Sequence, residues 1–212
     1  MKKALFLIVL LALSLTTSFS VVAEANLLSN ADFENGEGGW FGDAAFSLPD
    51  WNVWGTSGAR ELALNHTQGG TASVVTWHND TGVFQEFDAS AGETYTVSSY
   101  ALTRAADPAT NWDGLIKVEW SDGTTNVSED EVGRFYGGVD AVDSWKQIQN
   151  NLVAPSAATL GRVVLYVTDN GGGDTSGSVA WDDIDVATVP EPASLMLLAS
   201  GLLGLFGISR KK

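Results

Sequence analysis

Residues 94–102 read Thr-Tyr-Thr-Val-Ser-Ser-Tyr-Ala-Leu, and their alternation decides the fold class. Odd-numbered positions from Tyr95 share one face of an extended strand, and even-numbered positions from Thr96 share the other. Residues 163–167, Val-Val-Leu-Tyr-Val, are apolar on both faces, which predicts a strand at the centre of a sheet. Strands divided by Gly, Asn, Asp and Ser are predicted at 73–77, 83–87, 95–102, 115–120, 146–152, 161–168 and 178–186.

This pattern predicts an all-β domain. No segment between the two chain ends keeps a helical period over ten or more residues. The pair Asp122-Gly123 between Trp120 and Thr125 is a hairpin signal. The spacing of runs and turns predicts a jelly-roll β-sandwich of about eight to ten strands, flanked by an N-terminal signal helix and a short C-terminal transmembrane helix.

The N-terminus has the composition of a secretion signal. Two lysines precede an almost entirely apolar run at 4–15, and Ala23 and Ala25 have the A-x-A spacing of a cleavage site. The mature chain is predicted to start at Asn26, with cleavage after Ala23 as the alternative. An uncleaved anchor helix is disfavoured, because the apolar run is shorter than the ~20 residues that a membrane span needs.

The C-terminus carries a second apolar segment. Pro190, Glu191 and Pro192 precede an apolar run at 193–208, and Arg-Lys-Lys occupies 210–212. As a helix, this run would be about 24 Å long at ~1.5 Å per residue, compared with a hydrocarbon core of ~30 Å. It is therefore predicted to insert as a short transmembrane helix whose basic end stays in the cytoplasm.

The two ends divide the chain into a signal peptide at 1–25, a β-sandwich domain at 26–188, and a tail at 189–212 that contains the transmembrane segment. Both ends agree on one topology, because the signal exports the domain behind it and the basic end of the tail stays inside. We expect a protein that is transiently anchored in the inner membrane and then reaches the cell surface or the extracellular space.

The tail has three parts in a fixed order: Pro-Glu-Pro at 190–192, an apolar stretch with glycines, and a basic end. This order resembles the PEP-CTERM sorting signal of Gram-negative bacteria. In that family, a membrane protease called exosortase is thought to process the tail near the motif, and the proteins accompany exopolysaccharide and biofilm production. The resemblance implies exosortase as a processing partner. A permanent tail anchor is the alternative.

The domain at 26–188 is strongly acidic. It contains six lysine and arginine residues against 24 aspartate and glutamate residues, which gives a net charge of −18. This charge repels nucleic acids and anionic lipid headgroups, so a neutral partner or a bound cation is favoured. The chain has no cysteine, which excludes disulfides, thiol catalysis and cysteine-ligated metal centres.

Four stretches of the domain occur one after another in a recognisable order. They are the opening sequence at 26–36 with Trp40 shortly after it, Gly-Val-Phe-Gln-Glu-Phe at 82–87, Ala-Gly-Glu-Thr-Tyr-Thr-Val at 91–97, and Ala-Trp-Asp-Asp-Ile-Asp-Val at 180–186. Together they resemble the secreted β-jelly-roll carbohydrate-binding modules of the galactose-binding-like superfamily. The resemblance implies the fold more strongly than it implies sugar binding.

In those modules a structural calcium ion ties the first strand to the last. The resemblance implies three ligands for it: the backbone carbonyl of Asp32 and the carboxylates of Glu34 and Asp182. Calcium takes about six to eight oxygen ligands, and carboxylates strengthen its binding. The chain departs from the family at one acidic ligand, since Gln68 or Thr71 stands there. An acidic edge without a metal is the alternative.

Aromatic residues in loop-like stretches are the candidates for sugar contacts. An aromatic ring stacks on the apolar face of a sugar, while neighbouring polar side chains bond its hydroxyls. The predicted carbohydrate-binding residues are Trp51, Asn52, Trp54, Asn111 and Trp112. The alternative is that these tryptophans cap the ends of the sandwich.

Three further tryptophans, Trp40, Trp145 and Trp181, stand at positions that resemble the framework of the family. We assign them to packing, because some of the eight tryptophans must fill the core.

No motif of a catalytic site is present. His66 and His78 lie outside any H-E-x-x-H motif, and G-x-S-x-G does not occur. A glycosidase-type carboxylate pair gives no specific signal among so many acidic residues. We expect a non-catalytic protein whose jelly roll binds carbohydrate, such as exopolysaccharide. The alternatives are a structural matrix protein without sugar specificity and, least favoured, a polysaccharide hydrolase or lyase.

Overall fold

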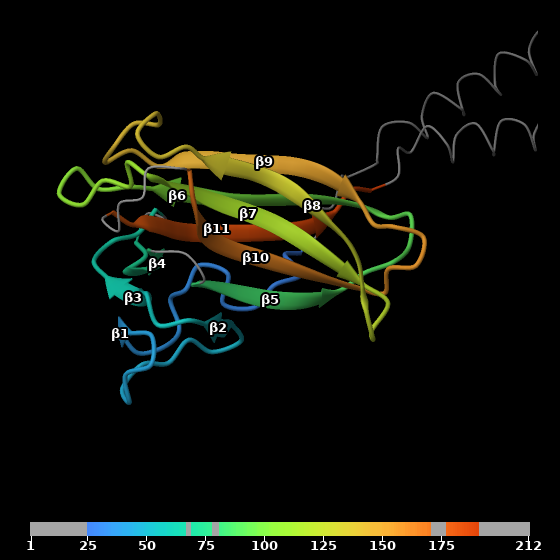
Figure 1. Ribbon diagram of the computed structural model, residues 1–212. Coiled ribbons are helices and arrows are strands. Elements are labelled where there is room, and N and C mark those ends of the chain that lie inside the picture. Colours follow the sequence, from blue (N-terminus) through green and yellow to red (C-terminus); the bar gives the residue numbers. More distant parts are fainter. Residues whose placement is uncertain (1–24, 67–68, 78–80, 171–176, 191–212) are drawn as a thin grey trace, which may run out of the picture. The chain divides into compact units, whose positions relative to one another are not determined.

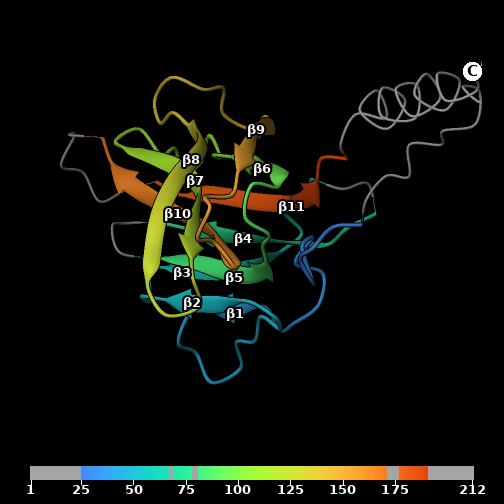
Figure 2. The ribbon, with the colours of Figure 1, turned by 90° about the vertical axis from the view of Figure 1, so that its right-hand side faces the viewer.

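The computed structural model describes residues 25–66, 69–77, 81–170 and 177–190, which form two antiparallel β-sheets (Figure 1 and Figure 2). One sheet has six strands in the order β1-β3-β4-β11-β6-β9, and the other has five in the order β2-β5-β10-β7-β8. The strands are β1 (Gly39–Trp40), β2 (Asn52–Trp54), β3 (Gly58–Leu62), β4 (Ala72–Thr76), β5 (Gly82–Asp88), β6 (Thr94–Leu102), β7 (Trp112–Ser121), β8 (Asn126–Phe135), β9 (Lys146–Val153), β10 (Leu160–Asp169) and β11 (Val179–Thr188). The predicted all-β class is confirmed, since these residues contain no helix.

All seven predicted strands are present, as β4, β5, β6, β7, β9, β10 and β11. The strand expected at the centre of a sheet is β10, which pairs along its length with β5 and β7. The predicted hairpin at Asp122-Gly123 joins β7 to β8, and the Asp122 carboxylate accepts hydrogen bonds from Thr124 and Thr125. The described residues hold eleven strands, more than expected, because β1, β2, β3 and β8 were not predicted.

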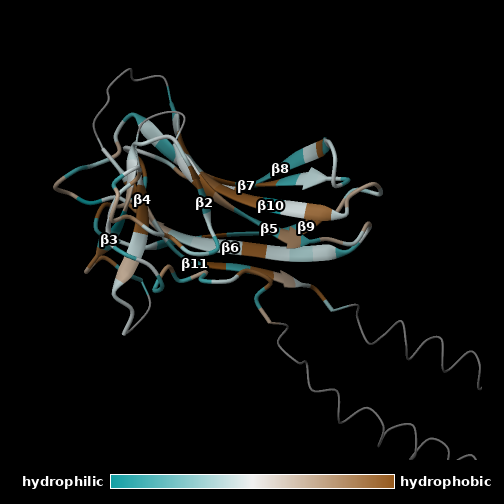
Figure 3. Ribbon diagram, turned by 90° about the horizontal axis from the view of Figure 1, so that it is seen from below, coloured by the Kyte–Doolittle hydropathy of each residue, from teal (hydrophilic) through white to brown (hydrophobic). Residues whose placement is uncertain are grey.

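Strand β8 escaped prediction because of its composition. It reads Asn-Val-Ser-Glu-Asp-Glu-Val-Gly-Arg-Phe, and its first half is mostly exposed to solvent. Acidic residues are depleted in strands, so the local sequence does not favour this conformation. The strand forms because it pairs with β7 through most of its length, and its residues are mostly hydrophilic in Figure 3.

The alternation along β10 separates the core from an outward face of the five-stranded sheet. Val163, Leu165 and Val167 are fully buried in the core cluster between the sheets. Arg162 and Tyr166 therefore point to the opposite face, away from the core. The same alternation in β5 and β7 builds one continuous outward surface, which carries the candidate site.

The two ends of the domain meet, as the resemblance implied. The backbone N–H of Leu27 donates to the carbonyl of Val186 at 2.8 Å, and the N–H of Ile184 donates to the carbonyl of Ala31 at 2.9 Å. The opening segment therefore runs alongside β11, although the two are separated by most of the domain in sequence.

Candidate functional site

A groove crosses the outward face of the five-stranded sheet. It has a volume of about 320 Å³ and receives side chains from β2, β5, β7 and β10. Its lining is formed by Trp54, Phe84, Lys117, Glu119, Arg162, Val164 and Tyr166. A concave surface that combines aromatic rings with a few charged groups is the usual form of a small-molecule site.

Three aromatic rings converge in the groove. The ring centroid of Trp54 lies 6.0 Å from that of Phe84 and 6.5 Å from that of Tyr166. Gly82 pairs with Trp54 on one side and with Tyr166 on the other. A Cβ atom at Gly82 would lie 2.4 Å from the Trp54 ring, so the glycine lets this indole lie across β5 and reach Tyr166.

Two cations and three carboxylates form an ion-pair network along the groove. Lys117 Nζ lies 2.9 Å from Glu119 Oε1 and 2.8 Å from Glu129 Oε2. Arg162 donates to Glu86 Oε1 at 2.6 Å and to Glu119 Oε2 at 3.4 Å. Burial alone would lower the pKa of Lys117, but Glu129 and Glu119 outweigh it and hold the pKa above its usual value. The groove thus offers fixed donors and acceptors without an excess of positive charge.

The two cations also lie over two of the aromatic rings. The Arg162 guanidinium is 4.6 Å from the centroid of Phe84, and Lys117 Nζ is 5.5 Å from that of Tyr166. Within the part of the chain that the structure describes, no cation lies over Trp54. Burial raises the pKa of Tyr166, so its hydroxyl remains a hydrogen-bond donor at neutral pH. Trp54 is therefore the ring best placed to stack against a ligand.

A second hollow of about 290 Å³ extends the groove toward the turn between β7 and β8. It shares Glu119 and Arg162 with the first hollow and ends at Thr124 and Thr125. Along β10, the two hollows run from Tyr166 to Leu160, a length of about 20 Å at ~3.3 Å per residue. This shape suits an extended chain better than a single compact ligand.

Two of the predicted sugar contacts lie in the core. Trp51 and Trp112 are only 7% and 6% exposed, so neither offers a ring face to a ligand. The Trp51 indole Nε1 donates to the carbonyl of Asn30 at 3.0 Å, and its ring lies 5.0 Å from that of Phe33. Their placement agrees with the packing alternative rather than with sugar contact.

The other three predicted contacts are accessible to different degrees. Trp54 lines the groove, and Asn52 is exposed on β2, where it pairs with Phe84. Asn111 is half-buried, and its carbonyl accepts a hydrogen bond from the N–H of Asn170. Asn111 does not line the groove. The structure therefore brings together Asn52 and Trp54 and separates them from Asn111.

Sequence reasoning missed Phe84, Tyr166 and Arg162 as groove residues. Tyr166 belongs to the run at 163–167 that was expected to be apolar on both faces, and Arg162 immediately precedes that run. Phe84 lies in a strand identified only by its β pattern. Their proximity depends on the register between β5 and β10, which no local signal reveals. The one available signal was the charge of Arg162 within an otherwise apolar strand.

The packing assignment of three tryptophans is correct in part. Trp181 is fully buried and donates to Thr76 Oγ1 at 2.9 Å. Trp145 is half-buried, and its ring lies 5.7 Å from that of His66 at an angle of 76°. Trp40 is 59% exposed, so its assignment to the core is wrong. It lies on the two-residue edge strand β1, where the outward face has no neighbouring layer.

The predicted calcium ligands Glu34 and Asp32 have hydrogen-bond partners within the protein. Glu34 accepts hydrogen bonds from the Thr71 N–H at 2.7 Å, the Thr71 hydroxyl at 2.7 Å and the Ala72 N–H at 3.0 Å. Burial alone would raise the pKa of Glu34, but these hydrogen bonds lower it. Asp32, whose backbone carbonyl is the predicted ligand, is exposed, and its carboxylate accepts a hydrogen bond from the backbone N–H of Glu34. Thr71, one of the two residues considered for the position of the missing acidic ligand, donates hydrogen bonds to Glu34.

Arg60 supplies a cation of the protein's own beside this segment. It is 3% exposed, and its guanidinium donates to the carbonyls of Phe33 at 2.7 Å and Glu34 at 2.8 Å. Among the described residues, which exclude Gln68, no three or more His, Cys, Asp or Glu side chains could together hold a metal ion. The oxygen donors suit calcium, but the described ligand set is incomplete, and calcium binding stays a prediction.

Asp182 is a fully buried carboxylate at the irregular point of β11. Its two carboxylate oxygens accept hydrogen bonds from the backbone N–H of His66 at 2.6 Å and from the backbone N–H of Asp183 at 2.8 Å. Burial raises the pKa of Asp182 to about 7, and the nearby charges of Asp183 and Glu34 add to this effect. The register between β11 and β6 shifts immediately after it, between Asp182 and Asp185.

His66 has a structural role in the same region. Its Nδ1 lies 2.7 Å from Asp183 Oδ2, and its ring stacks on Tyr100 with centroids 3.5 Å apart. These contacts fasten the loop before β4 onto β11 and β6. His78 lies outside the described residues.

The tail and the sandwich each have known counterparts. Residues 188–211 match a family model described as the PEP-CTERM protein-sorting motif. The chain carries a PEP-CTERM sorting signal. This motif implies export, a membrane-directed sorting signal and processing by an exosortase. A search among curated proteins found no significant match.

Most of this motif lies outside the described residues, as do the predicted signal peptide, its cleavage site and the predicted transmembrane segment at 193–208. Within the ranges that the structure does describe, there is no helix with the length and apolar character needed to cross a membrane.

Several solved structures resemble the sandwich. A xylan-binding family 22 module of Paenibacillus barcinonensis Xyn10C matches with a TM-score of 0.54 and 18% identity, over 82% of this chain and 100% of that one. TmCBM61, solved with β-1,4-galactotriose, matches with a TM-score of 0.51 and 18% identity, over 78% of this chain and 99% of that one.

An enzyme chain also matches. The enzymatically active domain of tailspike protein 4 from bacteriophage CBA120 gives a TM-score of 0.54 and 15% identity, over 77% of this chain. Only 21% of the tailspike chain is covered, so this protein corresponds to about a fifth of it. These likenesses show the fold and confirm the predicted jelly-roll class.

Proposed function

We propose that this is an exported, exosortase-sorted protein of the cell surface or extracellular matrix, whose jelly roll binds a neutral polysaccharide without catalysing a reaction. The observation that carries the proposal is the groove of the five-stranded sheet, in which Trp54, Phe84 and Tyr166 are flanked by ion-paired Arg162 and Lys117. Sugars require this combination of an apolar stacking surface and fixed polar partners.

The charge of the groove favours neutral sugars over acidic ones. Each cation is already held by carboxylates: Arg162 by Glu86 and Glu119, and Lys117 by Glu119 and Glu129. An acidic sugar would have to compete with these partners and approach a domain with a net charge of −18. A neutral sugar can instead bond the remaining lone pairs and N–H groups without breaking an ion pair.

The length of the groove favours a chain rather than a terminal sugar. The two hollows lie along β10 over about 20 Å, from Trp54 and Tyr166 to the turn between β7 and β8. Two of the structural neighbours are a xylan-binding domain and a module solved with a galactotriose. These neighbours support a polysaccharide as the class of ligand, and the exported location suggests an exopolysaccharide.

The sorting tail supports a surface or matrix location. A PEP-CTERM signal would hold the exported domain at the inner membrane until exosortase cleaves near residues 190–192. The released sandwich would then reach the extracellular polysaccharide. A structural matrix protein without sugar specificity is the alternative, and a binding experiment separates the two.

The test uses residues 26–188 as an isolated domain, because residues 25–189 form a separate compact unit. Its affinity is measured against soluble xylan, β-1,4-galactan and polysaccharide extracted from producing cells. Trp54→Ala should weaken binding at least about tenfold, which corresponds to ~1.4 kcal/mol. Val139→Ser, at an 81% exposed residue outside the groove, should leave it unchanged.

Two results would count against the proposal. If the wild-type domain binds no polysaccharide, the structural alternative is favoured. If folded Trp54→Ala binds as well as wild type, the ligand does not use this groove. Binding to a neutral polysaccharide should also change little between low and high salt, since no counter-charge is neutralised. Release of reducing sugar ends during incubation would favour the hydrolase alternative.

A further inference from the structure

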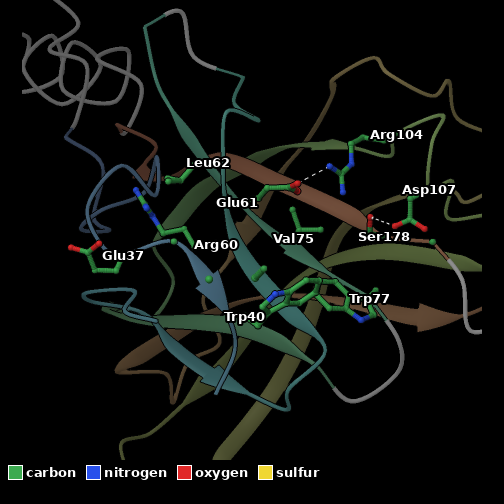
Figure 4. Close-up of a pocket in the computed structure, with 14 residues that line it drawn as sticks. Glu37, Trp40, Arg60, Glu61, Leu62, Val75, Trp77, Arg104, Asp107 and Ser178 are labelled. Carbon is green, nitrogen blue, oxygen red and sulfur yellow. Dashed lines mark hydrogen bonds and ion pairs between the residues drawn. The ribbon is translucent and has the colours of Figure 1, made fainter. Parts of the chain in front are cut away.

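Another hollow, separate from the two that form the groove, lies on the six-stranded sheet, over β1, β3 and β4 (Figure 4). It has a volume of about 710 Å³, larger than the groove of the five-stranded sheet. The register of these strands places Trp40 beside Ala59, and Ala59 beside Val75. Ala59 and Val75 are small, so the floor between the larger side chains is low. The depression therefore forms because a large side chain on β1 is followed by small side chains on β3 and β4.

Two tryptophans form one wall of this hollow. The rings of Trp40 and Trp77 lie 5.1 Å apart and nearly perpendicular, at 87°. Figure 4 shows them side by side at one end of the depression. Trp40 is 59% exposed, although burial of such a side chain would be favourable. The perpendicular contact with Trp77 holds the Trp40 ring in place, and more than half of the Trp40 side chain stays accessible to a ligand.

Polar side chains surround the remaining rim. Arg104 donates to Glu61 at 2.7 Å, and Ser178 donates to Asp107 at 2.8 Å. Both pairs face the depression opposite the tryptophans, and Glu37 lies to one side (Figure 4). Each pair joins residues that are far apart in sequence, so the donors and acceptors are held in place before a ligand arrives.

We propose that this hollow is a second carbohydrate-binding site for a neutral saccharide. The lining has three carboxylates, Glu37, Glu61 and Asp107, against two arginines. Arg104 is half-buried and paired with Glu61, and Arg60 is buried and donates to backbone carbonyls. This balance repels phosphate, uronic acids and acidic peptides. An open indole face beside paired carboxylates matches the apolar face and the hydroxyl groups of a neutral sugar ring.

The position of this site has a consequence for the whole domain. The groove lies on the outward face of the five-stranded sheet. The hollow over β1, β3 and β4 lies on the outward face of the six-stranded sheet. A single stretch of a polysaccharide chain cannot occupy both sites, because the core separates the two faces. One domain would therefore join two chains and act as a non-covalent cross-link, with avidity for a polysaccharide network. The cross-linking consequence rests on the proposed function of the groove; the second site does not.

The test is a stoichiometry measurement by isothermal titration calorimetry with the domain at 26–188. The probes are xylohexaose, β-1,4-galactotriose and oligosaccharides prepared from the polysaccharide of producing cells. Wild-type domain should bind two equivalents of an active probe. Trp40→Ala should bind one, Trp54→Ala should bind one, and the double variant should bind none. Because Trp40 is exposed, Trp40→Ala should keep a melting temperature close to that of wild type.

A second variant guards against an indirect effect on the fold. Glu37→Gln keeps both tryptophans and should weaken the second site about tenfold, as expected for loss of a charged hydrogen bond. Wild-type domain mixed with the matching long polysaccharide should form a cross-linked network, seen as a rise in turbidity or as a precipitate. Trp40→Ala should form neither. Val139→Ser is the matched control for both measurements.

The outcomes separate the two proposals. One equivalent in wild type, with Trp40→Ala and Glu37→Gln unchanged, overturns the second site and leaves the groove intact. Loss of binding in Trp40→Ala with Trp54→Ala unchanged supports the second site and overturns the groove. No binding of any probe by wild type overturns both.

Discussion

The buried carboxylate of Asp182 makes the stability of the domain depend on pH. Its pKa is raised to about 7 in the folded protein, mainly by burial, compared with 3.8 as the ordinary value. The folded state therefore binds a proton that the unfolded state releases between about pH 4 and pH 7. Stability contributed by this protonation is present at low pH and is lost as the pH rises through the folded pKa.

The size of the effect can be worked out from the two pKa values. Between pH 5 and pH 8, linkage through Asp182 alone lowers the free energy of unfolding by about 2.5 kcal/mol. For a domain of this size, that is a fall of roughly 5–10 °C in melting temperature. Asp182→Asn removes the titrating group and keeps the shape of the side chain, so it should flatten this part of the pH profile.

The assay is urea denaturation monitored by tryptophan fluorescence, at pH 5, 6, 7 and 8 in EDTA. The quantity compared is the change in unfolding free energy between pH 5 and pH 8, so that any constant cost of the amide cancels. Asp88→Asn, at an exposed carboxylate on β5, is the matched control and should keep the wild-type slope. If Asp182→Asn also keeps the wild-type slope, Asp182 is ionised in the folded protein throughout this range and the reasoning is wrong.

Three further predictions concern other parts of the chain. Calcium should raise the melting temperature of the wild-type domain more than magnesium does, and Glu34→Gln should remove the difference; equal shifts with both ions that survive in the variant would mean charge screening. Gly161→Ala should destabilise the domain by at least ~2 kcal/mol in denaturant titrations, because its Cβ would lie 2.2 Å from the Phe87 ring; a smaller loss would show that the ring moves freely. The intact mass of protein from the envelope or medium should correspond to cleavage near Ala25 and near 190–192, and a tail-containing mass in every fraction would indicate a permanent anchor.

The strands that sequence reasoning found were those whose pattern is local. Alternation in 94–102 and the apolar run at 163–167 correspond to β6 and β10 because these strands are paired on both sides and buried. Strand β8 has no such pattern, since its conformation is set by pairing with β7 rather than by its own residues. Short edge strands such as β1 carry too few residues for a period to be recognised.

The residues of the candidate site also divide into those that local sequence reveals and those that depend on strand pairing. Trp54 could be identified because an aromatic residue beside Asn52 in a turn-rich stretch favours exposure. Trp51 and Trp112 have equivalent neighbours in sequence but are buried, and Trp40 was placed in the core but is exposed. Exposure of a tryptophan depends on which strands cover it, and that depends on long-range register rather than on local composition.

Tertiary register also explains the missed groove residues. Phe84 and Tyr166 belong to strands that are paired in space but distant in sequence, and Arg162 reaches Glu86 across the same pairing. The adjacency of the opening and closing segments was anticipated only through a resemblance to a family. Composition gave the acidity and the absence of cysteine, and these limited the classes of partner without locating a site.

Binding of a neutral polysaccharide chain in the groove of the five-stranded sheet can be observed residue by residue. The ¹⁵N-labelled Trp40→Ala domain is titrated with the best-binding oligosaccharide while amide and indole chemical shifts are recorded. We predict that the largest changes fall on the Trp54 indole N–H and on the backbone amides of Arg162 and Tyr166. Saturable binding that leaves these three signals unchanged would show that the groove is not the site.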